Sequence, residues 1–515
     1  MKTLPDSLPD DAEALKQLLL ERESLWQNKY HALLDQWRLA QHKRFGTSSE
    51  AQPGQGELFN EAEQEAEPAQ DEESAEETIT YTRRKPGRSR LPEDLPRERV
   101  IIDIEDKTCA CCGGELHQLG EETSEKLEFV PARIKVIEQV RPKYGCRSCE
   151  REGTRVDIRI APVPPSPIPK SIATPSLLAQ IITAKFQYSL PLYRQESLFK
   201  HYGIELSRKT MSQWMLRSAT LLTPIYRQLH EHLLKQGVIW ADETTLKVIE
   251  VEARSKSYMW VYGSGGDRPK EDGLHNIVLY EYRRSREHRH PVNFLEGYQG
   301  YLQVDGYAGY EKTKATLVGC LAHARRRFHE AQIAQPKGKT GKADWALNHI
   351  QKLYRIEKEA KGEPPDEIHR RRQQRAKPLL KQFKAWLDKS ALHVPPQSLL
   401  GKAVHYTLRQ WPKLERYVED GRLAIDNNRA ERAIKPFVIG RKNWLFSNTE
   451  SGAAASATLY SLVETAKANG LVPFDYLAYL LVELPKLAAD DSLTYGGVTD
   501  PDGFFGVNGL FRFRI

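Results

Sequence analysis

Apolar residues recur near the start of the chain at spacings of seven, four, three and four: Leu19, Trp26, Tyr30, Leu33 and Trp37. This spacing predicts a helix whose apolar seam forms a short coiled coil. Glu23 interrupts the seam, so an amphipathic helix that packs on its own domain is the alternative. We expect residues 1–45 to be helical and to mediate self-association, which predicts a homo-oligomer.

The centre of the chain alternates apolar and polar residues, as β-strands do. The alternation predicts four strands and then a fifth that leads into a basic helix, within 237–250, 255–265, 275–285, 300–310 and 316–331. The first three are expected to be antiparallel neighbours. Three strands followed by two strand–helix units is the order of a ribonuclease-H-like core, in which the first and fourth strands are adjacent.

The rest of the chain divides by composition and helical periodicity. We predict an α/β multidomain protein with these parts: a helical segment 1–45, an acidic disordered linker 46–82, a basic arm with a small β-rich zinc-binding module 83–160, a helical, helix-turn-helix-like region 161–232, the first part of the core 233–334, an α-helical insertion 335–420, the C-terminal part of the core 421–484 and an atypical tail 485–515.

Charge is unevenly distributed along the 515 residues, although the net charge is only +7. Ten acidic residues lie between Glu57 and Glu77, and no Lys or Arg lies between Arg44 and Arg83. The remainder is therefore more basic than the average, which favours a polyanionic partner such as DNA. No apolar run is long enough to cross a bilayer and the N-terminal residues show no signal pattern, so we expect a cytoplasmic protein near the bacterial nucleoid without membrane partners.

Four of the six cysteines form two C-x2-C pairs: Cys109 with Cys112, and Cys146 with Cys149. Each pair lies in a turn-like context, and the segment between them alternates like strands. Four thiolates in this arrangement predict one structural zinc site whose coordination is filled by protein. Four reduced core cysteines are the alternative, and Cys111 is a spare that competes as a ligand.

Basic residues lie beside two predicted turns. Arg83, Arg84 and Arg88 flank a Pro-Gly turn that suits insertion into a narrow minor groove. Ser207 is a good N-cap for a helix that opens with Arg208 and Lys209, and this is the outline of a helix-turn-helix. A solvated basic linker and an ordinary helical hairpin have the same patterns. The basic run 369–375 likewise predicts either a DNA-backbone contact or a solvated helix face.

Three carboxylates fit the strand order. Asp242 ends the apolar run of the first strand, Asp305 ends that of the fourth, and Glu431 follows a helix start at 426–428. Phosphodiester cleavage or transfer uses two metal ions about 4 Å apart, and oxygen ligands with open positions suit Mg2+, or Mn2+. We expect these three residues to hold the ions, with Asp242 preferred to the adjacent Glu243 because neighbours on a strand face opposite sides.

Basic and aromatic residues follow Glu431 closely. Lys435, Arg441 and Lys442 are expected to hold DNA phosphates against the acidic site, while Trp444 packs in the core or stacks on an unpaired base. Cys320 and His323 form a C-x2-H pair with no second pair nearby. Cys320 is therefore expected to be buried at a strand end, and His323 to start a basic helix within reach of the scissile phosphate.

The chain resembles the insertion-sequence 66 family of transposases. The likeness rests on ADETTLKV, on VDGYAGY followed by CLAHARRRF, and on DNNRAERAIKPFVIGRKNWLF running into SGAAASATLYSLVETAKANGL. It extends over residues 15–484 through RFGTSSE, KPGRSRLPEDLPRERV, the cysteine pairs and LPLYRQE. The resemblance implies a DDE catalytic core with Asp242, Asp305 and Glu431 as metal ligands, binding of terminal inverted repeats by the N-terminal modules, and strand transfer into target DNA. The tail from Asp490 departs from the short ending expected in this family.

Two other functions use the same features. A non-catalytic DNA-binding regulator needs only the zinc module, the helix-turn-helix and the dimerising helix. A ribonuclease-H-like nuclease uses the carboxylates to cut DNA without joining it. Accessory proteins encoded by the same element are possible partners of a transposase.

Overall fold

A computed structural model describes residues 11–45, 134–144, 159–251, 256–266, 276–335 and 341–489. The chain divides into two compact units, one formed by Met1–Glu61 with Pro162–Ile515 and the other by Ala62–Ala161. In the described part of the second unit, the short strands β1 (Lys143–Tyr144) and β2 (Arg159–Ile160) pair antiparallel. All further elements belong to the first unit.

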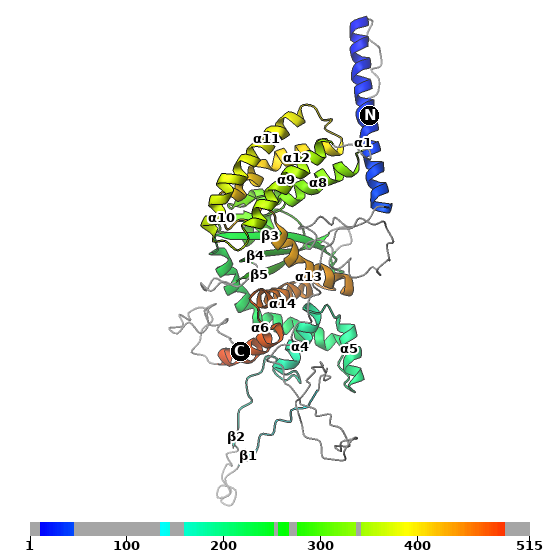
Figure 1. Cartoon of the computed structure of the whole chain (residues 1–515). Coiled ribbons are helices and arrows are strands. Elements are labelled where there is room, and N and C mark those ends of the chain that lie inside the picture. The colour runs from blue at the N-terminus through cyan, green and yellow to red at the C-terminus, as the bar shows by residue number, and fades with distance from the viewer. Residues whose placement is uncertain are drawn as a thin grey trace, which may run out of the picture. The chain divides into compact units, whose positions relative to one another are not determined.

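A five-stranded mixed sheet lies at the centre of the first unit (Figure 1). Its strands are β3 (Val238–Leu246), β4 (Ser257–Ser264), β5 (Ile277–Arg283), β6 (Tyr301–Gln303) and β7 (Thr316–Val318). The order across the sheet is β5-β4-β3-β6-β7. The predicted antiparallel pairing of the first three strands is confirmed, as is the adjacency of the first and fourth, because β6 pairs parallel to β3.

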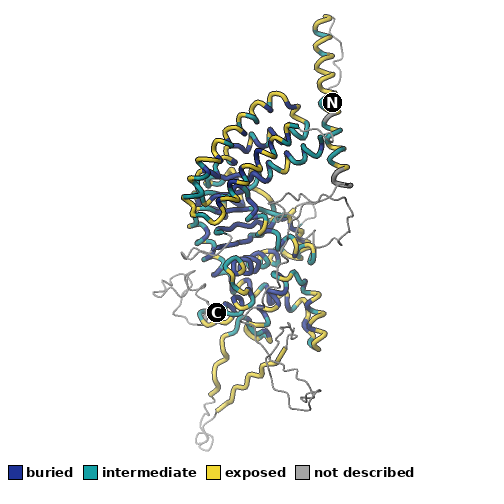
Figure 2. The backbone as a smooth tube through the Cα atoms, in the orientation of Figure 1, coloured by how far each residue is buried: buried dark blue, intermediate teal, exposed yellow. Residues whose placement is uncertain are grey.

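One set of helices shares a hydrophobic core with this sheet, and buried residues gather where these helices meet the strands (Figures 1 and 2). These helices are α4 (Pro175–Phe186), α6 (Arg208–Leu234), α13 (Asn428–Trp444), α14 (Glu450–Ala468) and α15 (Pro473–Ala489). Between β5 and β7 the chain also forms α7 (Arg289–Phe294) and a 3-10 turn η1 (Ala308–Lys312).

The predicted helix start at Ser207 is confirmed. α5 (Leu192–His201) ends before Gly203, whose φ of 74° is a backbone conformation that glycine adopts without strain. The Ser207 hydroxyl then accepts a hydrogen bond from the Thr210 N–H at 3.2 Å, which caps α6. Because Met211, Trp214 and Met215 are buried in the core, α6 presents only its other face to solvent.

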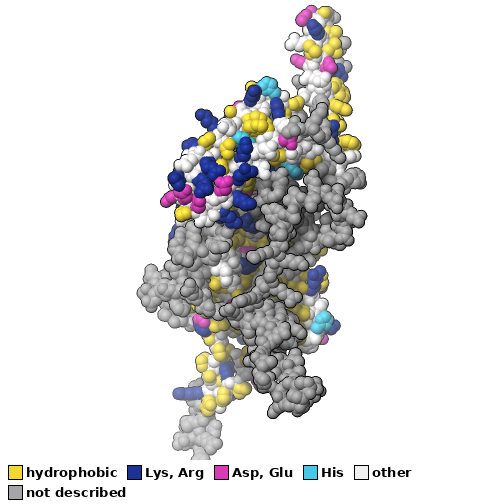
Figure 3. All heavy atoms as spheres, viewed as in Figure 1, with side chains coloured by type: hydrophobic (Ala, Val, Ile, Leu, Met, Phe, Trp, Pro, Cys, Tyr) yellow, Lys and Arg dark blue, Asp and Glu magenta, His cyan; other side chains and the backbone are white. Residues whose placement is uncertain are grey.

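A second hydrophobic cluster lies among the helices that follow β7. They are α8 (Leu321–Ile333), α9 (Lys342–Glu359), α10 (Pro365–Arg371), a π-helical turn η2 (Arg372–Ala376), α11 (Lys377–Ala391), α12 (Leu399–Leu414) and a 3-10 turn η3 (Glu415–Val418). On the face shown in Figure 3, Lys and Arg side chains gather over these helices together with acidic side chains. The chain returns from this cluster to the sheet through residues 419–427.

The outer edge of the sheet is covered by a helix. The β5 backbone N–H groups of Val278 and Tyr280 donate to the hydroxyls of Thr465 (3.1 Å) and Ser461 (2.7 Å) on α14. The Thr465 hydroxyl in turn donates to the Val278 carbonyl at 2.9 Å. An uncovered edge strand would present unpaired backbone groups to other chains, and α14 removes this exposure for β5.

The first helix, α1 (Ala12–Phe45), has the predicted helical structure. Its later turns contact the second cluster, because Asp35 accepts a hydrogen bond from the Leu399 N–H at 3.3 Å and Arg38 donates to the Ala334 carbonyl at 3.0 Å. All five seam residues named above remain more than half exposed.

None of the helices in the described ranges combines the length and apolar character needed to cross a membrane.

Candidate functional site

Asp242 and Asp305 lie on neighbouring parallel strands. The register of β3 and β6 pairs Val238 with Tyr301 and Trp240 with Gln303. When this register is continued by two residues, Asp242 is opposite Asp305, where β6 has ended and the chain turns. The Asp305 carboxylate accepts the Tyr307 N–H at 2.8 Å, which fixes this turn. The two aspartates therefore come together at the same end of adjacent strands.

Glu431 approaches the same place from the first turn of α13. The predicted helix start at 426–428 is confirmed, but Asn427 does not cap the helix with its side chain. Instead, the Asn427 amide donates to the carbonyl of Ala241 at 2.8 Å. This bond joins the start of α13 to the β3 residue immediately before Asp242.

The three carboxylates influence one another electrostatically. Burial raises the pKa of Asp242 well above its usual range, and the negative charges of Glu243, Asp305 and Glu431 raise it further. Burial also raises the pKa of Glu431, with additional contributions from Asp426 and Asp305, while Arg326 opposes the shift. Such mutual repulsion in a desolvated site is relieved by a bound cation.

Glu243 is held by partners of its own. Its carboxylate accepts Arg286 Nε at 2.8 Å and the Tyr310 hydroxyl at 2.6 Å. Burial, followed by the charge of Asp305, raises the pKa of Glu243, and Tyr310 and Arg286 counteract that rise. Because both of its oxygens have protein partners, Glu243 is less available to a metal ion than Asp242.

Cys320 and His323 lie beside Glu431. Cys320 is buried directly before α8, as predicted, and His323 lies in the first turn of that helix. His323 Nε2 is 4.0 Å from Glu431 Oε1. Burial lowers the pKa of His323, with Arg326 adding to the effect and Asp305 opposing it. Burial raises the pKa of the Cys320 thiol to about 12.

The basic residues after Glu431 differ in their surroundings. Arg441 donates from Nη1 to the hydroxyls of Thr244 and Thr245, each at 3.2 Å, so it attaches the last turns of α13 to β3. Lys442 is exposed and Lys435 is half-buried. Trp444 packs against Phe437 with ring centroids 5.5 Å apart, which supports the core-packing alternative.

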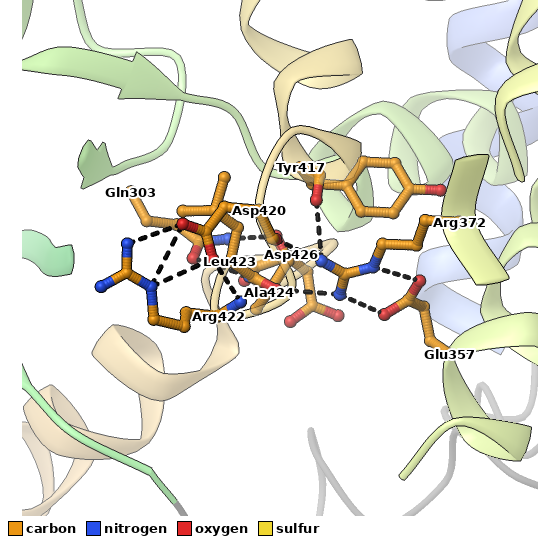
Figure 4. A network of polar contacts seen from close by, with 9 residues as sticks. All are labelled: Gln303, Glu357, Arg372, Tyr417, Asp420, Arg422, Leu423, Ala424 and Asp426. Carbon is orange, nitrogen blue, oxygen red and sulfur yellow. Dashed lines mark hydrogen bonds and ion pairs between the residues drawn. The ribbon is translucent and has the colours of Figure 1, made fainter. Parts of the chain in front are cut away.

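The segment that carries the chain into α13 is fixed by two buried polar side chains (Figure 4). Gln303, at the end of β6, donates to the carbonyls of Ala424 (2.6 Å) and Asp426 (2.7 Å). Arg372 donates to the carbonyls of Tyr417 (2.7 Å), Asp420 (2.8 Å) and Leu423 (2.9 Å).

Arg372 is only 3% exposed and pairs with Glu357 at 2.6 Å. Both interpretations of the basic run 369–375, a DNA-backbone contact and a solvated helix face, are therefore wrong for this residue. The arginine satisfies backbone carbonyls, as the helices of the second cluster enclose it.

Other predicted contacts are either exposed or outside the described residues. Arg208 and Lys209 are exposed at the start of α6. Arg83, Arg84, Arg88 and the zinc ligands Cys109, Cys112, Cys146 and Cys149 lie outside the described residues, as do the linker and the tail from Asp490.

A mixed sheet with helices and clustered carboxylates, in a chain that also carries segments predicted to hold zinc and DNA, is typical of a DNA-processing protein. Comparison with family models agrees. The model "Transposase IS66 family" matches residues 170–455, and that of the "zinc-finger binding domain of transposase IS66" matches 106–150. Two further models match, "Transposase C of IS166 homeodomain" at 32–100 and "IS66 C-terminal element" at 461–493. The chain belongs to the transposase IS66 family.

Relatives from Sinorhizobium fredii (strain NBRC 101917 / NGR234) are similar over most of their length. The uncharacterized protein y4jD is 36% identical over 402 residues, which cover 76% of this chain and 77% of the relative. The uncharacterized protein y4hP is 34% identical over 423 residues, which cover 79% of this chain and 75% of the relative.

The family domains support transposase function with DNA as partner. The zinc-finger match includes both C-x2-C pairs and supports a structural zinc.

Two residues that shape the site are not distinguished by the sequence. Asn427 is predicted only to start a helix, whereas its side chain connects α13 to β3. Arg372 is one of several arginines in a basic run. The C-x2-H spacing of Cys320 and His323 is visible in the sequence. Glu431, which lies beside them in the fold, is 108 positions beyond His323 in the chain.

Proposed function

We propose that this protein is a DDE-type DNA transposase, which binds the terminal inverted repeats of an insertion sequence and catalyses DNA cleavage and strand transfer. The observation that carries the proposal is the convergence of three carboxylates from separate elements: Asp242 from β3, Asp305 from the end of β6 and Glu431 from α13. Their charges act on one another. A chance group of surface acids would not be tied together by buried side chains such as Asn427.

The proposal includes a ribonuclease-H-like core. The strand order β5-β4-β3-β6-β7 supports this core. In it, β5, β4 and β3 pair antiparallel with their neighbours, and β3, β6 and β7 pair parallel. In this arrangement the long helical segment between α8 and α13 is an insertion that leaves the carboxylates together. The remaining domain boundaries predicted from the sequence are part of the same proposal.

The donor set fits Mg2+, or Mn2+. Carboxylate oxygens are hard ligands, and three of them leave positions for water and substrate oxygens. Within the described residues, the one group of three potential ligands whose atoms all lie within 4.8 Å is a different one. The three carboxylates come from separate elements, and two ions about 4 Å apart can share ligands of this kind. Bound ions would activate the attacking oxygen and stabilise the leaving oxygen.

The chain's own side chains would prepare the site for a phosphodiester. Asp242 is fixed by β3, Asp305 by the turn that follows β6, and Glu431 through Asn427. Lys435 and Lys442 offset the charge of the phosphates that approach three acids. Arg441 acts at a distance by holding α13 on β3. His323 Nε2 is 4.0 Å from Glu431 Oε1, so a phosphate held beside Glu431 would also lie near His323.

DNA ends would be bound by other parts of the chain. We assign this role to Arg208 and Lys209 at the exposed start of α6, and to Arg83, Arg84 and Arg88 in the basic arm. Synapsis of two ends needs at least two protomers, and the exposed seam of α1 offers an apolar surface for self-association. Accessory proteins of the same element and a location at the nucleoid belong to this proposal too.

A strand-transfer assay tests the function. The protein is incubated with a DNA fragment carrying the element's ends, a target plasmid and Mg2+. We expect joined products from the wild type, and their loss with Asp242→Asn, Asp305→Asn or Glu431→Gln, while binding of the ends is retained. Cuts without joining would indicate a nuclease, and a bound but intact fragment would indicate a regulator.

Two acids in α14 serve as matched controls. Glu450 pairs with Arg284 and Glu464 pairs with Lys467 at 2.8 Å, so neither is directed at the carboxylate cluster. Glu450→Gln and Glu464→Gln should retain strand transfer. If Glu431→Gln stays active while one of these controls abolishes joining, the third ligand is misassigned. If all three carboxylate variants remain active, the DDE assignment fails.

A further inference from the structure

Cys320, His323 and Glu431 form a three-residue cluster that the proposed reaction does not use as a unit. One ligand atom from each lies within 4.8 Å of those from the other two. Cys320 and His323 are fixed at the start of α8, and Glu431 at the start of α13. The cluster is thus built where two helix starts meet.

The donor types select a metal other than Mg2+. A thiolate, an imidazole and a carboxylate are the ligands of Zn2+ and similar borderline ions, whereas Mg2+ prefers oxygen alone. Tetrahedral zinc with bonds of 2.0 to 2.3 Å places its ligand atoms roughly 3.3 to 3.8 Å apart. The 4.0 Å between His323 Nε2 and Glu431 Oε1 therefore needs only a small side-chain adjustment.

One contact and one unpartnered atom bear on how this cluster would hold an ion. The Cys320 sulfur accepts the backbone N–H of Asn427 at 3.2 Å, the kind of outer contact that orients a sulfur ligand. His323 Nδ1 is buried and has no hydrogen-bond partner among the described residues. A buried polar nitrogen without a partner is costly, and an ion bound at Nδ1 after the ring turns, in place of Nε2, would remove that cost.

We propose that Cys320, His323 and Glu431 bind one Zn2+-like ion with a fourth position open, and that this ion inhibits strand transfer by withdrawing Glu431 from the carboxylate cluster. The inhibitory part rests on the proposed function, since it requires Glu431 to be a ligand of the catalytic ions. The binding part does not. A carboxylate shared by two sites makes occupation of one compete with occupation of the other.

Cobalt spectroscopy on the full chain tests the binding. Co2+ is added to the purified protein, and the thiolate-to-cobalt charge-transfer band is compared between wild type and Cys320→Ser. In the wild type we expect one component of this band to saturate when one equivalent of Co2+ has been added, and this component should be absent from Cys320→Ser. The amount of zinc bound in the N-terminal module should be the same in both proteins. His323→Gln keeps the thiol and should weaken Co2+ binding by more than about tenfold. Circular dichroism checks that both variants are folded. Identical bands in wild type and Cys320→Ser would overturn the site.

Strand-transfer assays test the inhibition. Each protein is measured relative to its own activity in Mg2+ alone, and Zn2+ is then titrated. We expect wild type to be inhibited at Zn2+ concentrations at least about tenfold below those that affect Cys320→Ser. Equal inhibition of the two would overturn the competition. If wild type shows no strand transfer in Mg2+, the proposed function fails, and the cobalt spectra still decide whether the ion binds.

Discussion

The side-chain amide of Asn427 donates a hydrogen bond to the carbonyl oxygen of Ala241 at 2.8 Å, and Asn427 is 2% exposed. The bond joins the residue before Asp242 to a residue four positions before Glu431. It therefore sets the distance between two carboxylates that are far apart along the chain.

Replacement of Asn427 should separate those carboxylates. We expect Asn427→Ala to lose strand transfer by more than about tenfold and to destabilise the protein by about 1 to 3 kcal/mol, because a buried carbonyl loses its donor. Activity titrated against Mg2+ should reach half of its maximum at a higher Mg2+ concentration, since the ligands are less well positioned. An unchanged Mg2+ dependence would show that this bond is only structural.

Arg372 gives a prediction about stability. Its removal leaves Glu357 without its partner and three backbone carbonyls without donors. We expect Arg372→Met to destabilise the protein by about 3 to 5 kcal/mol, as loss of one member of a buried ion pair does. Thermal unfolding measures the change. The matched control is Lys384→Met, which removes a surface pair with Asp388 and should cost only about 0.3 to 0.5 kcal/mol. Similar losses for both variants would contradict this role of Arg372.

The positions of the strands along the chain were predictable because alternation is a local pattern, and it places Asp242 and Asp305 at strand ends. The adjacency of the first and fourth strands is a long-range relationship, and it was expected only from the likeness of the element order to a ribonuclease-H-like core. Glu431 was predictable because Asp426, Asn427 and Asn428 mark a helix start. Arg372 was not, since nothing local distinguishes it from Arg370 and Arg371 in the same basic run. The difference is whether neighbouring helices enclose the side chain, and this depends on contacts with residues 417–423, more than 40 positions away.

The raised pKa of Asp242 predicts a dependence of stability on pH. Burial, with help from Glu243 and Asp305, makes the folded chain bind this proton more tightly than the unfolded chain. The stabilising contribution is therefore complete below the unfolded pKa of about 3.9 and is lost as the pH rises through the folded pKa. Without added Mg2+, we expect the wild type to lose stability over that interval.

Asp242→Asn cannot ionise, so at pH 7 without added Mg2+ it should unfold at a higher temperature than the wild type. Added Mg2+ should raise the unfolding temperature of the wild type and leave that of the variant nearly unchanged. Unfolding curves across a pH series measure both effects. A variant less stable than the wild type at pH 7 would show that the carboxylate is not a source of repulsion.

The exposed start of α6 predicts a measurable electrostatic contribution to DNA binding. Arg208→Ala and Lys209→Ala should each weaken binding of the element's ends and reduce the salt slope by about one for every phosphate that the protein no longer neutralises. Arg217→Ala, an exposed arginine further along the same helix, is the control. Equal salt slopes for all three variants and the wild type would remove α6 from the DNA interface.

The N-terminal zinc module should depend on its metal for folding. We expect Cys112→Ser to lose the metal and unfold that module, because thiolate ligation contributes directly to the folding of small zinc domains. Metal analysis and circular dichroism of the full chain measure the loss, and Cys111→Ser is the matched control. Retention of a full equivalent of zinc in Cys112→Ser, with its loss in Cys111→Ser, would reassign the ligand.

The cover that α14 provides for β5 has a consequence during protein synthesis. Tyr280 and its partner Ser461 are 181 residues apart, and a ribosome that adds roughly 5 to 20 residues per second needs about 9 to 36 s to make the intervening chain. Throughout that interval the edge of β5 has no helix to shield it, so neighbouring nascent chains on one messenger can pair along it. Slow codons between the two segments would lengthen this exposure, and a chaperone that binds extended apolar segments would have its greatest effect before residue 461 is made.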